Sequence, residues 1–171
     1  MNSMNLQEYE GLIAGARVLS ADRHGPKVYE LADGSVVKLF RRKRLLSTAL
    51  LYPYAARFAR AAKGLAQRDI RCVKVTRVAR VPSIKRDVVG YDYLPGRPLR
   101  AELVDAMDDG DKLAALLRQQ ARYVAELHKR RIYFRAIHFN NVIVCPDGEL
   151  GLIDISEARA CRLPLSPSKR A

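Results

Sequence analysis

This sequence lacks the patterns that identify several common classes of protein. Its longest apolar window, around residues 47–56, is too short to cross a bilayer. Its three cysteines, Cys72, Cys145 and Cys161, are odd in number and follow no zinc spacing. The N-terminal stretch shows no basic start followed by a long apolar run. We therefore expect a cytoplasmic protein with reduced thiols, no signal peptide and no transmembrane segment.

Acidic side chains are scarce, and none lies between residues 35 and 68. The 171 residues include 31 Lys and Arg against 18 Asp and Glu, a net charge of +13. Such a balance suits an anionic partner: a nucleotide, a nucleic acid, a phospholipid or lipopolysaccharide. A solvated basic surface is the alternative. The residues of the acid-free segment that we expect to form an anion-binding surface are Arg41, Arg42, Lys43, Arg44, Arg57 and Arg60.

The order of the predicted elements indicates one α+β domain over residues 1–171, with two lobes. Residues 6–16 form a predicted helix, and residues 41–67 a helical region interrupted at Pro53. The strongest helical pattern covers residues 111–131. Predicted strands cover residues 17–21, 27–31, 35–40, 72–80 and 86–93, followed by a rigid connector at 94–98. The fold class predicted is therefore a five-stranded antiparallel sheet with one helix, followed by a helical part.

Lys38 lies within the third predicted strand, among the apolar residues of SVVKLF. Burial of a lysine among such neighbours requires a charge for its ammonium group. A contact with an anionic group such as a phosphate is one interpretation of this position. The alternative is an ordinary alternating strand with Lys38 on its solvated side.

Asn141 and Asp154 bracket two short apolar runs, residues 142–145 and 150–153, joined by the turn Pro-Asp-Gly. Amide and carboxylate oxygens, completed by phosphate oxygens and water, suit Mg²⁺. The alternative is a capping Asn and a turn-forming Asp. His138, in the loop before Asn141, is either a residue that hydrogen-bonds backbone, a phosphate contact or, least favoured, a general base.

Three blocks of the sequence together resemble the lipopolysaccharide kinase branch of the protein-kinase-like superfamily, including small bacterial proteins labelled toluene tolerance proteins. The blocks are ARVLSADRHGPKVYELADGSVVKLFRRKRLL, LLYPYAARFAR and YFRAIHFNNVIVCPDGELGLIDIS. The resemblance implies a protein-kinase-like fold, with a first lobe at about residues 12–94 and a reduced, truncated second lobe at about 95–165. It also implies ATP and Mg²⁺ as cofactors. By matching position, Lys38 would bind phosphate, Asn141 and Asp154 would hold the metal, and His138 would be the loop histidine.

Four departures from the family pattern concern catalysis. Ala136 stands where the family has its catalytic Asp. The helix after the third strand offers no acid to pair with Lys38, and the first hairpin has only Gly25 in place of a glycine-rich loop. Seventeen residues follow Asp154, fewer than an activation segment and large-lobe helices need.

Two main functional hypotheses follow from this pattern. The favoured one is a kinase-like protein that binds ATP and Mg²⁺, is connected with lipopolysaccharide, and has weak or no phosphotransferase activity. The alternative is an inactive pseudokinase interaction module, peripheral to the inner membrane. A basic nucleic-acid-binding domain ranks third, because zinc and RNA-recognition motifs are absent. The acceptor substrate and the oligomeric state do not follow from the sequence.

Overall fold

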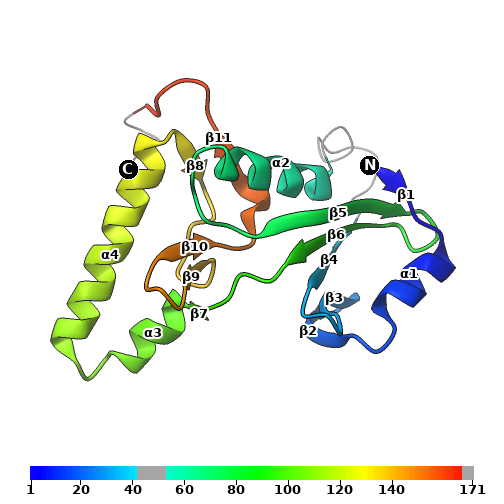
Figure 1. Ribbon diagram of the computed structural model, residues 1–171, viewed down its shortest axis with the longest axis horizontal. Helices are drawn as coiled ribbons and strands as arrows, with labels where there is room; N and C mark the ends of the chain where they lie inside the picture. The colour runs from blue at the N-terminus through cyan, green and yellow to red at the C-terminus, as the bar shows by residue number, and fades with distance from the viewer. Residues whose placement is uncertain (42–52, 167–171) are drawn as a thin grey trace. The chain divides into compact units, whose positions relative to one another are not determined.

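The computed structural model describes residues 1–41 and 53–166, which fall into two compact units (Figure 1). The first unit contains residues 1–60 and 73–93, and the second contains residues 61–72 and those from 94 onward. Helix α2, Tyr54–Ala66, contributes residues to both. Its start directly after Pro53 agrees with the preference of proline for the beginning of a helix.

The first unit is built on a six-stranded sheet in the order β1-β5-β6-β4-β3-β2. The strands are β1 Asn2–Ser3, β2 Arg17–Asp22, β3 Gly25–Glu30, β4 Val36–Arg41, β5 Lys74–Val81 and β6 Arg86–Asp92. The last five are antiparallel neighbours, as their alternating patterns predict. The prediction of five strands was nevertheless wrong, because β1 adds a sixth strand parallel to β5. A strand of two residues is too short to produce an alternating pattern.

Helix α1, Leu6–Ile13, covers one face of this sheet. A capping box begins the helix: Glu8 donates its backbone N–H to the Asn5 side chain, and Asn5 donates its own to the Glu8 carboxylate. Tyr9 of the helix packs with Val37, Leu39 and other buried residues of the strands. This contact forms the hydrophobic core of the first unit.

The second unit combines two helices with short strands. Its elements are β7 Arg97–Pro98, α3 Leu99–Asp105, α4 Gly110–Lys129, β8 Ile132–Phe134, β9 Val142–Val144, β10 Leu150–Leu152, the 3₁₀ turn η1 Ile155–Glu157 and β11 Ala158–Ala160. The strands form a three-stranded sheet, β10-β9-β7, and a pair, β11-β8. Figure 1 shows α3 leading into the long helix α4. Leu99, Leu127, Ile132, Leu152 and Ile155 are fully buried and form much of its core.

No helix within residues 1–41 and 53–166 combines the length and the apolarity that a bilayer-crossing segment needs.

Candidate functional site

The β9–β10 hairpin of the second unit brings Asn141 and Asp154 to the same end of a two-stranded ladder. Val142 pairs with Leu152 at that end, so Asn141 directly precedes the ladder and Ile153 directly follows it. The backbone N–H of Ile153 donates to the Asn141 carbonyl over 3.0 Å. Two residues that are distant in sequence therefore become neighbours through antiparallel pairing.

Asn141 is buried, and its side-chain amide has a defined orientation. Its Nδ2 donates to the carbonyl oxygen of Ala136 over 2.9 Å, and its backbone N–H donates to the His138 carbonyl over 2.8 Å. The donor end of the amide is thus bound to the loop, while Oδ1 is the acceptor end. An oxygen held in this way is suited to a hard cation.

Asp154 adopts a left-handed backbone conformation, with φ 49° and ψ 44°, at the junction between β10 and η1. Non-glycine residues adopt this conformation infrequently, and aspartate is one of those that tolerate it. The residue is exposed, whereas Leu152 before it and Ile155 after it are buried. Because Leu152 and Ile155 are buried on either side, the left-handed conformation of Asp154 is held in place and its carboxylate stays exposed.

The loop that carries Ala136 and His138 is fastened to neighbouring structure by its backbone. His138 donates its N–H to the Ala136 carbonyl over 3.1 Å, and the Phe139 carbonyl accepts from Arg100 at the start of α3 over 3.2 Å. His138 is exposed in this loop. Ala136 thus offers no carboxylate, but its backbone carbonyl orients Asn141.

Arg71 anchors the hairpin at two points. Its carbonyl accepts from Leu152 on β10 over 3.0 Å, and its guanidinium contacts the Asp147 carboxylate in the hairpin turn at 2.7 Å. The hydrogen bond from Arg71 is the main reason why the pKa of Asp147 is lowered. Gln119 of α4 adds a bond to the Gly148 carbonyl over 2.7 Å. These contacts fix the hairpin that presents Asn141 and Asp154.

Lys38 belongs to the first unit, where it lies on β4 between Val28 of β3 and Val89 of β6. The side chain is partly buried, and its Nζ lies 5.6 Å from the ring centroid of Phe40 and 6.0 Å from that of Phe58. Both distances are within the range of cation–π attraction. The lysine therefore lies in an aromatic environment.

The basic residues predicted to bind anions are only partly described. Arg42, Lys43 and Arg44 lie outside the described residues. Arg41 ends β4 and is exposed, as is Arg60 on α2, while Arg57 is partly buried with its guanidinium 5.0 Å from the Tyr54 ring. Helix α2 contains no acidic residue that could pair with Lys38.

Three positioning features were not predicted: the Ala136 carbonyl, the Arg71 anchor and the aromatic rings beside Lys38. Phe58 stacks on Tyr91 with ring centroids 5.4 Å apart, and it also contacts Phe40. Backbone acceptors and long-range contacts have no local sequence signal. The apolar positions of α2 and of the strands predicted that these rings would be buried, but not that they would contact one another.

The oxygen atoms of Asn141 and Asp154 fit a metal ion whose remaining ligands come from water and a bound substrate. Within the described part of the chain, no group of three or more His, Cys, Asp or Glu residues could hold a metal ion by itself. One carboxylate and one amide oxygen instead suit Mg²⁺, which usually keeps water and takes phosphate oxygens from a substrate.

Comparison with known proteins shows the fold. No family model and no curated protein matches the sequence. Among solved structures 1262 chains match, so the fold is widespread. One is WbdD, in a co-crystal structure with the kinase inhibitor LY294002. The TM-score is 0.50 at 18% sequence identity, over 80% of this chain. The match spans 32% of the WbdD chain, about a third of its length. At this identity the likeness concerns the kinase-like fold alone.

Proposed function

We propose that this protein binds a nucleotide together with Mg²⁺, and that its role is connected with lipopolysaccharide or the cell envelope. The observation that carries the proposal is the β9–β10 hairpin, which places the Asn141 amide and the Asp154 carboxylate at one end. In kinase-like phosphotransferases an Asn and an Asp in this order hold Mg²⁺ against the nucleotide phosphates. Lys38 is the proposed phosphate contact of the first unit.

The comparisons and the sequence support this proposal in different ways. The likeness to WbdD, which was crystallised with a kinase inhibitor, supports a kinase-like nucleotide site. The connection with lipopolysaccharide rests on the three sequence blocks that resemble the lipopolysaccharide kinase branch, including proteins labelled toluene tolerance proteins. Ala136 offers no carboxylate to accept a hydroxyl proton, so any phosphoryl transfer would rest on positioning of the metal and its phosphate by Asn141 and Asp154.

The test is a thermal-shift and calorimetric titration with Mg·ATP on wild type and Asp154→Asn. A ligand that binds the native state alone stabilises it by about 2.7 kcal/mol at a hundredfold excess over Kd. Asn tolerates the left-handed conformation but removes the charge, so Asp154→Asn should fold and lose most of this stabilisation.

Glu149→Gln is the matched control, because Glu149 is an exposed carboxylate at the other end of the same hairpin. It should bind Mg·ATP like the wild type. Unchanged Mg·ATP affinity in Asp154→Asn would refute the metal role. Absence of wild-type stabilisation at millimolar Mg·ATP would refute nucleotide binding.

The second candidate function is that of a pseudokinase module that docks on an anionic membrane surface without using nucleotide. Ala136 in the catalytic position and the exposed Arg41 and Arg60 favour it. Salt-dependent vesicle binding without any response to Mg·ATP would identify this function.

A further inference from the structure

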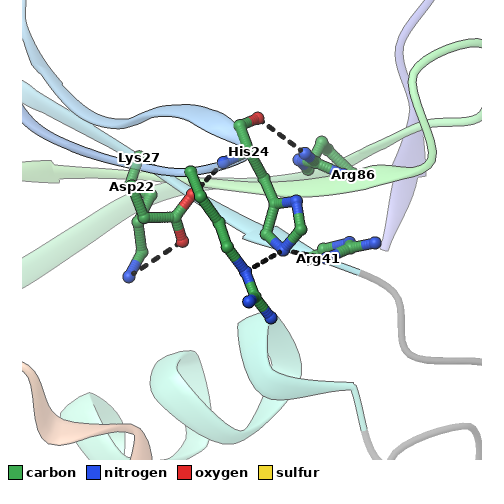
Figure 2. Close-up of polar contacts among 6 residues, drawn as sticks. Asp22, His24, Lys27, Arg41 and Arg86 are labelled. Atoms are coloured by element: carbon green, nitrogen blue, oxygen red, sulfur yellow. Dashed lines mark hydrogen bonds and ion pairs between the residues drawn. The ribbon is translucent and has the colours of Figure 1, made fainter.

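Four cations and a histidine converge where the β2–β3 turn meets the ends of β4 and β6 (Figure 2). His24 Nε2 lies 2.5 Å from Nη1 of Arg41 and 3.2 Å from Nε of Arg23. Arg86 of β6 donates to the His24 carbonyl over 3.4 Å. Asp22 contributes the carboxylate, which accepts from the His24 backbone N–H over 2.8 Å and pairs with Lys27 at 3.6 Å.

The contacts of His24 are compatible with one tautomer of its imidazole ring. Arginine side chains donate hydrogen bonds and cannot accept them. The contacts of Nε2 with Arg23 and Arg41 are therefore hydrogen bonds only where Nε2 is the acceptor, as in the tautomer that carries its proton on Nδ1. A single lone pair thus serves two guanidinium groups. Within residues 1–41 and 53–166, this arrangement leaves most of the guanidinium donors for another acceptor.

The cluster lies apart from Lys38. Side chains alternate between the two faces of a strand, so Lys38 and Phe40 share one face of β4 while Leu39 and Arg41 share the other. Leu39 belongs to the core that α1 covers, whereas Lys38 lies over the aromatic rings. Arg86, the direct partner of Arg41 across β4 and β6, is on the same face as Arg41.

We propose that Arg23, His24, Arg41 and Arg86 form a second anion site, which takes a doubly charged oxyanion such as a phosphate group and takes up a proton at His24 when it binds. A tetrahedral oxyanion offers several acceptors to the guanidinium groups and leaves the His24 lone pair free for the proton. The imidazolium then becomes a further donor to the ligand. Without the anion, protonation would place a third positive charge beside Arg23 and Arg41.

The other charged groups around His24 do not account for a response near neutral pH. Arginine stays protonated throughout this range. The pKa of Asp22 is lowered, chiefly by the hydrogen bond from the His24 backbone, so its carboxylate stays ionised. Lys27 contacts that carboxylate and not the imidazole. His24 is therefore the group whose protonation would link binding to pH.

The test uses sulfate, because its charge does not change between about pH 6 and about pH 8, where histidine titrates. Calorimetry at constant ionic strength should show sulfate binding about 5-fold tighter at the lower pH, as expected when a proton is taken up on binding. Titration in two buffers of different ionisation enthalpy should measure the proton uptake directly. His24→Gln should remove the pH dependence, and Arg41→Ala should weaken binding at both pH values.

Controls separate this site from the others. Arg17→Ala removes an exposed arginine from the same hairpin, where it pairs with Glu30 outside the cluster, and should leave sulfate binding unchanged. Lys74→Met removes an exposed lysine of β5, which pairs with Asp92 outside the cluster, and should also leave sulfate binding unchanged. Circular dichroism should confirm that each variant is folded. Equal sulfate affinity at both pH values, a pH dependence that survives in His24→Gln, or loss of binding in Lys74→Met would overturn the proposal.

Competition identifies the source of the phosphate group. Displacement of sulfate by inorganic phosphate, with no effect of phosphatidic acid vesicles, would assign the site to a soluble phosphate compound. Displacement by the vesicles would assign it to a lipid headgroup. Either result supports the oxyanion site, whereas failure of both phosphate probes to displace sulfate would overturn it.

Discussion

Asp154 shows how one residue can combine local strain with a proposed ligand role. Its left-handed conformation favours glycine, which adopts positive φ without steric cost. We expect Asp154→Gly to raise the free energy of unfolding by about 0.5–1 kcal/mol and to abolish Mg·ATP binding. Urea denaturation and calorimetry on the same samples would test both effects. Asp154→Ala is the control, since it removes the carboxylate without relieving the strain; equal stability of the two variants would contradict the strain.

Ala136 is the second residue with a specific expectation. The variant Ala136→Asp retains the backbone carbonyl that orients Asn141. A general base contributes about 10²–10⁴-fold, so the variant should raise a weak activity without reaching the about 1–100 per second of kinases. Helix α2 would still offer Lys38 no acidic partner.

The measurement for Ala136→Asp is ATP turnover, together with transfer to purified lipopolysaccharide core. Asp154→Ala in the same background is the control for contaminating kinase activity. Robust transfer by the wild type that is lost in Asp154→Ala would contradict our preference for binding over catalysis. His138 would then be the next residue to test as the base.

At the scale of elements, the connector before β7 approaches β9 closely. A Cβ on Gly96, where φ is 133°, would clash with the Val144 carbonyl and lie 2.7 Å from Cγ2 of Ile143. We therefore expect Gly96→Ala to lower the free energy of unfolding by about 3 kcal/mol or more, as measured by urea denaturation.

Gly148→Ala separates the effect of the clash from that of the backbone conformation. Gly148 also has a positive φ, 81°, but no atom lies within 4 Å of the added Cβ. Its cost should be only about 1–2 kcal/mol. Equal losses in the two variants would show that β7 does not pack on β9 as described.

At the scale of the whole molecule, the net charge of +13 favours association with anionic surfaces. Each basic residue near such a surface contributes about 1 kcal/mol, so replacing Arg41, Arg57 and Arg60 by Ala should weaken binding to anionic vesicles by roughly 100-fold. Because screening acts over about 8 Å at physiological salt, the wild-type binding should also fall as salt increases. Vesicle co-sedimentation at low and high salt would measure both effects.

A control variant with Ala at Lys112, Arg118 and Arg122 removes the same number of charges from exposed positions on α4. If it weakens binding as much as the first variant, net charge and not the proposed surface is responsible. Equal binding to neutral vesicles would contradict the electrostatic mechanism. A single-stranded oligonucleotide in the same assay tests the nucleic-acid alternative by its salt dependence.

The sequence by itself determined the elements whose signals are local. Alternation predicted β2 to β6, the Asp-Gly pair predicted the β3–β4 turn, and the apolar stripe predicted α4. The position of Asn141 and Asp154 at the ends of two short strands also followed from spacing. These features depend on residues that are close together in the sequence, so the periodicity of apolar residues and the residue types of the turns predict them.

Only the tertiary structure decided which side chains meet. Arg71 contacts Asp147, which lies 76 positions later in the sequence. Ala136 orients Asn141 through a backbone carbonyl that any residue would provide, and Arg41 meets His24 from another strand. The parallel strand β1 was likewise invisible in a two-residue pattern. Such contacts arise from the packing of elements that are distant in sequence. No local pattern encodes their geometry, and for this reason the proposed anion site at His24 could be found only in the folded chain.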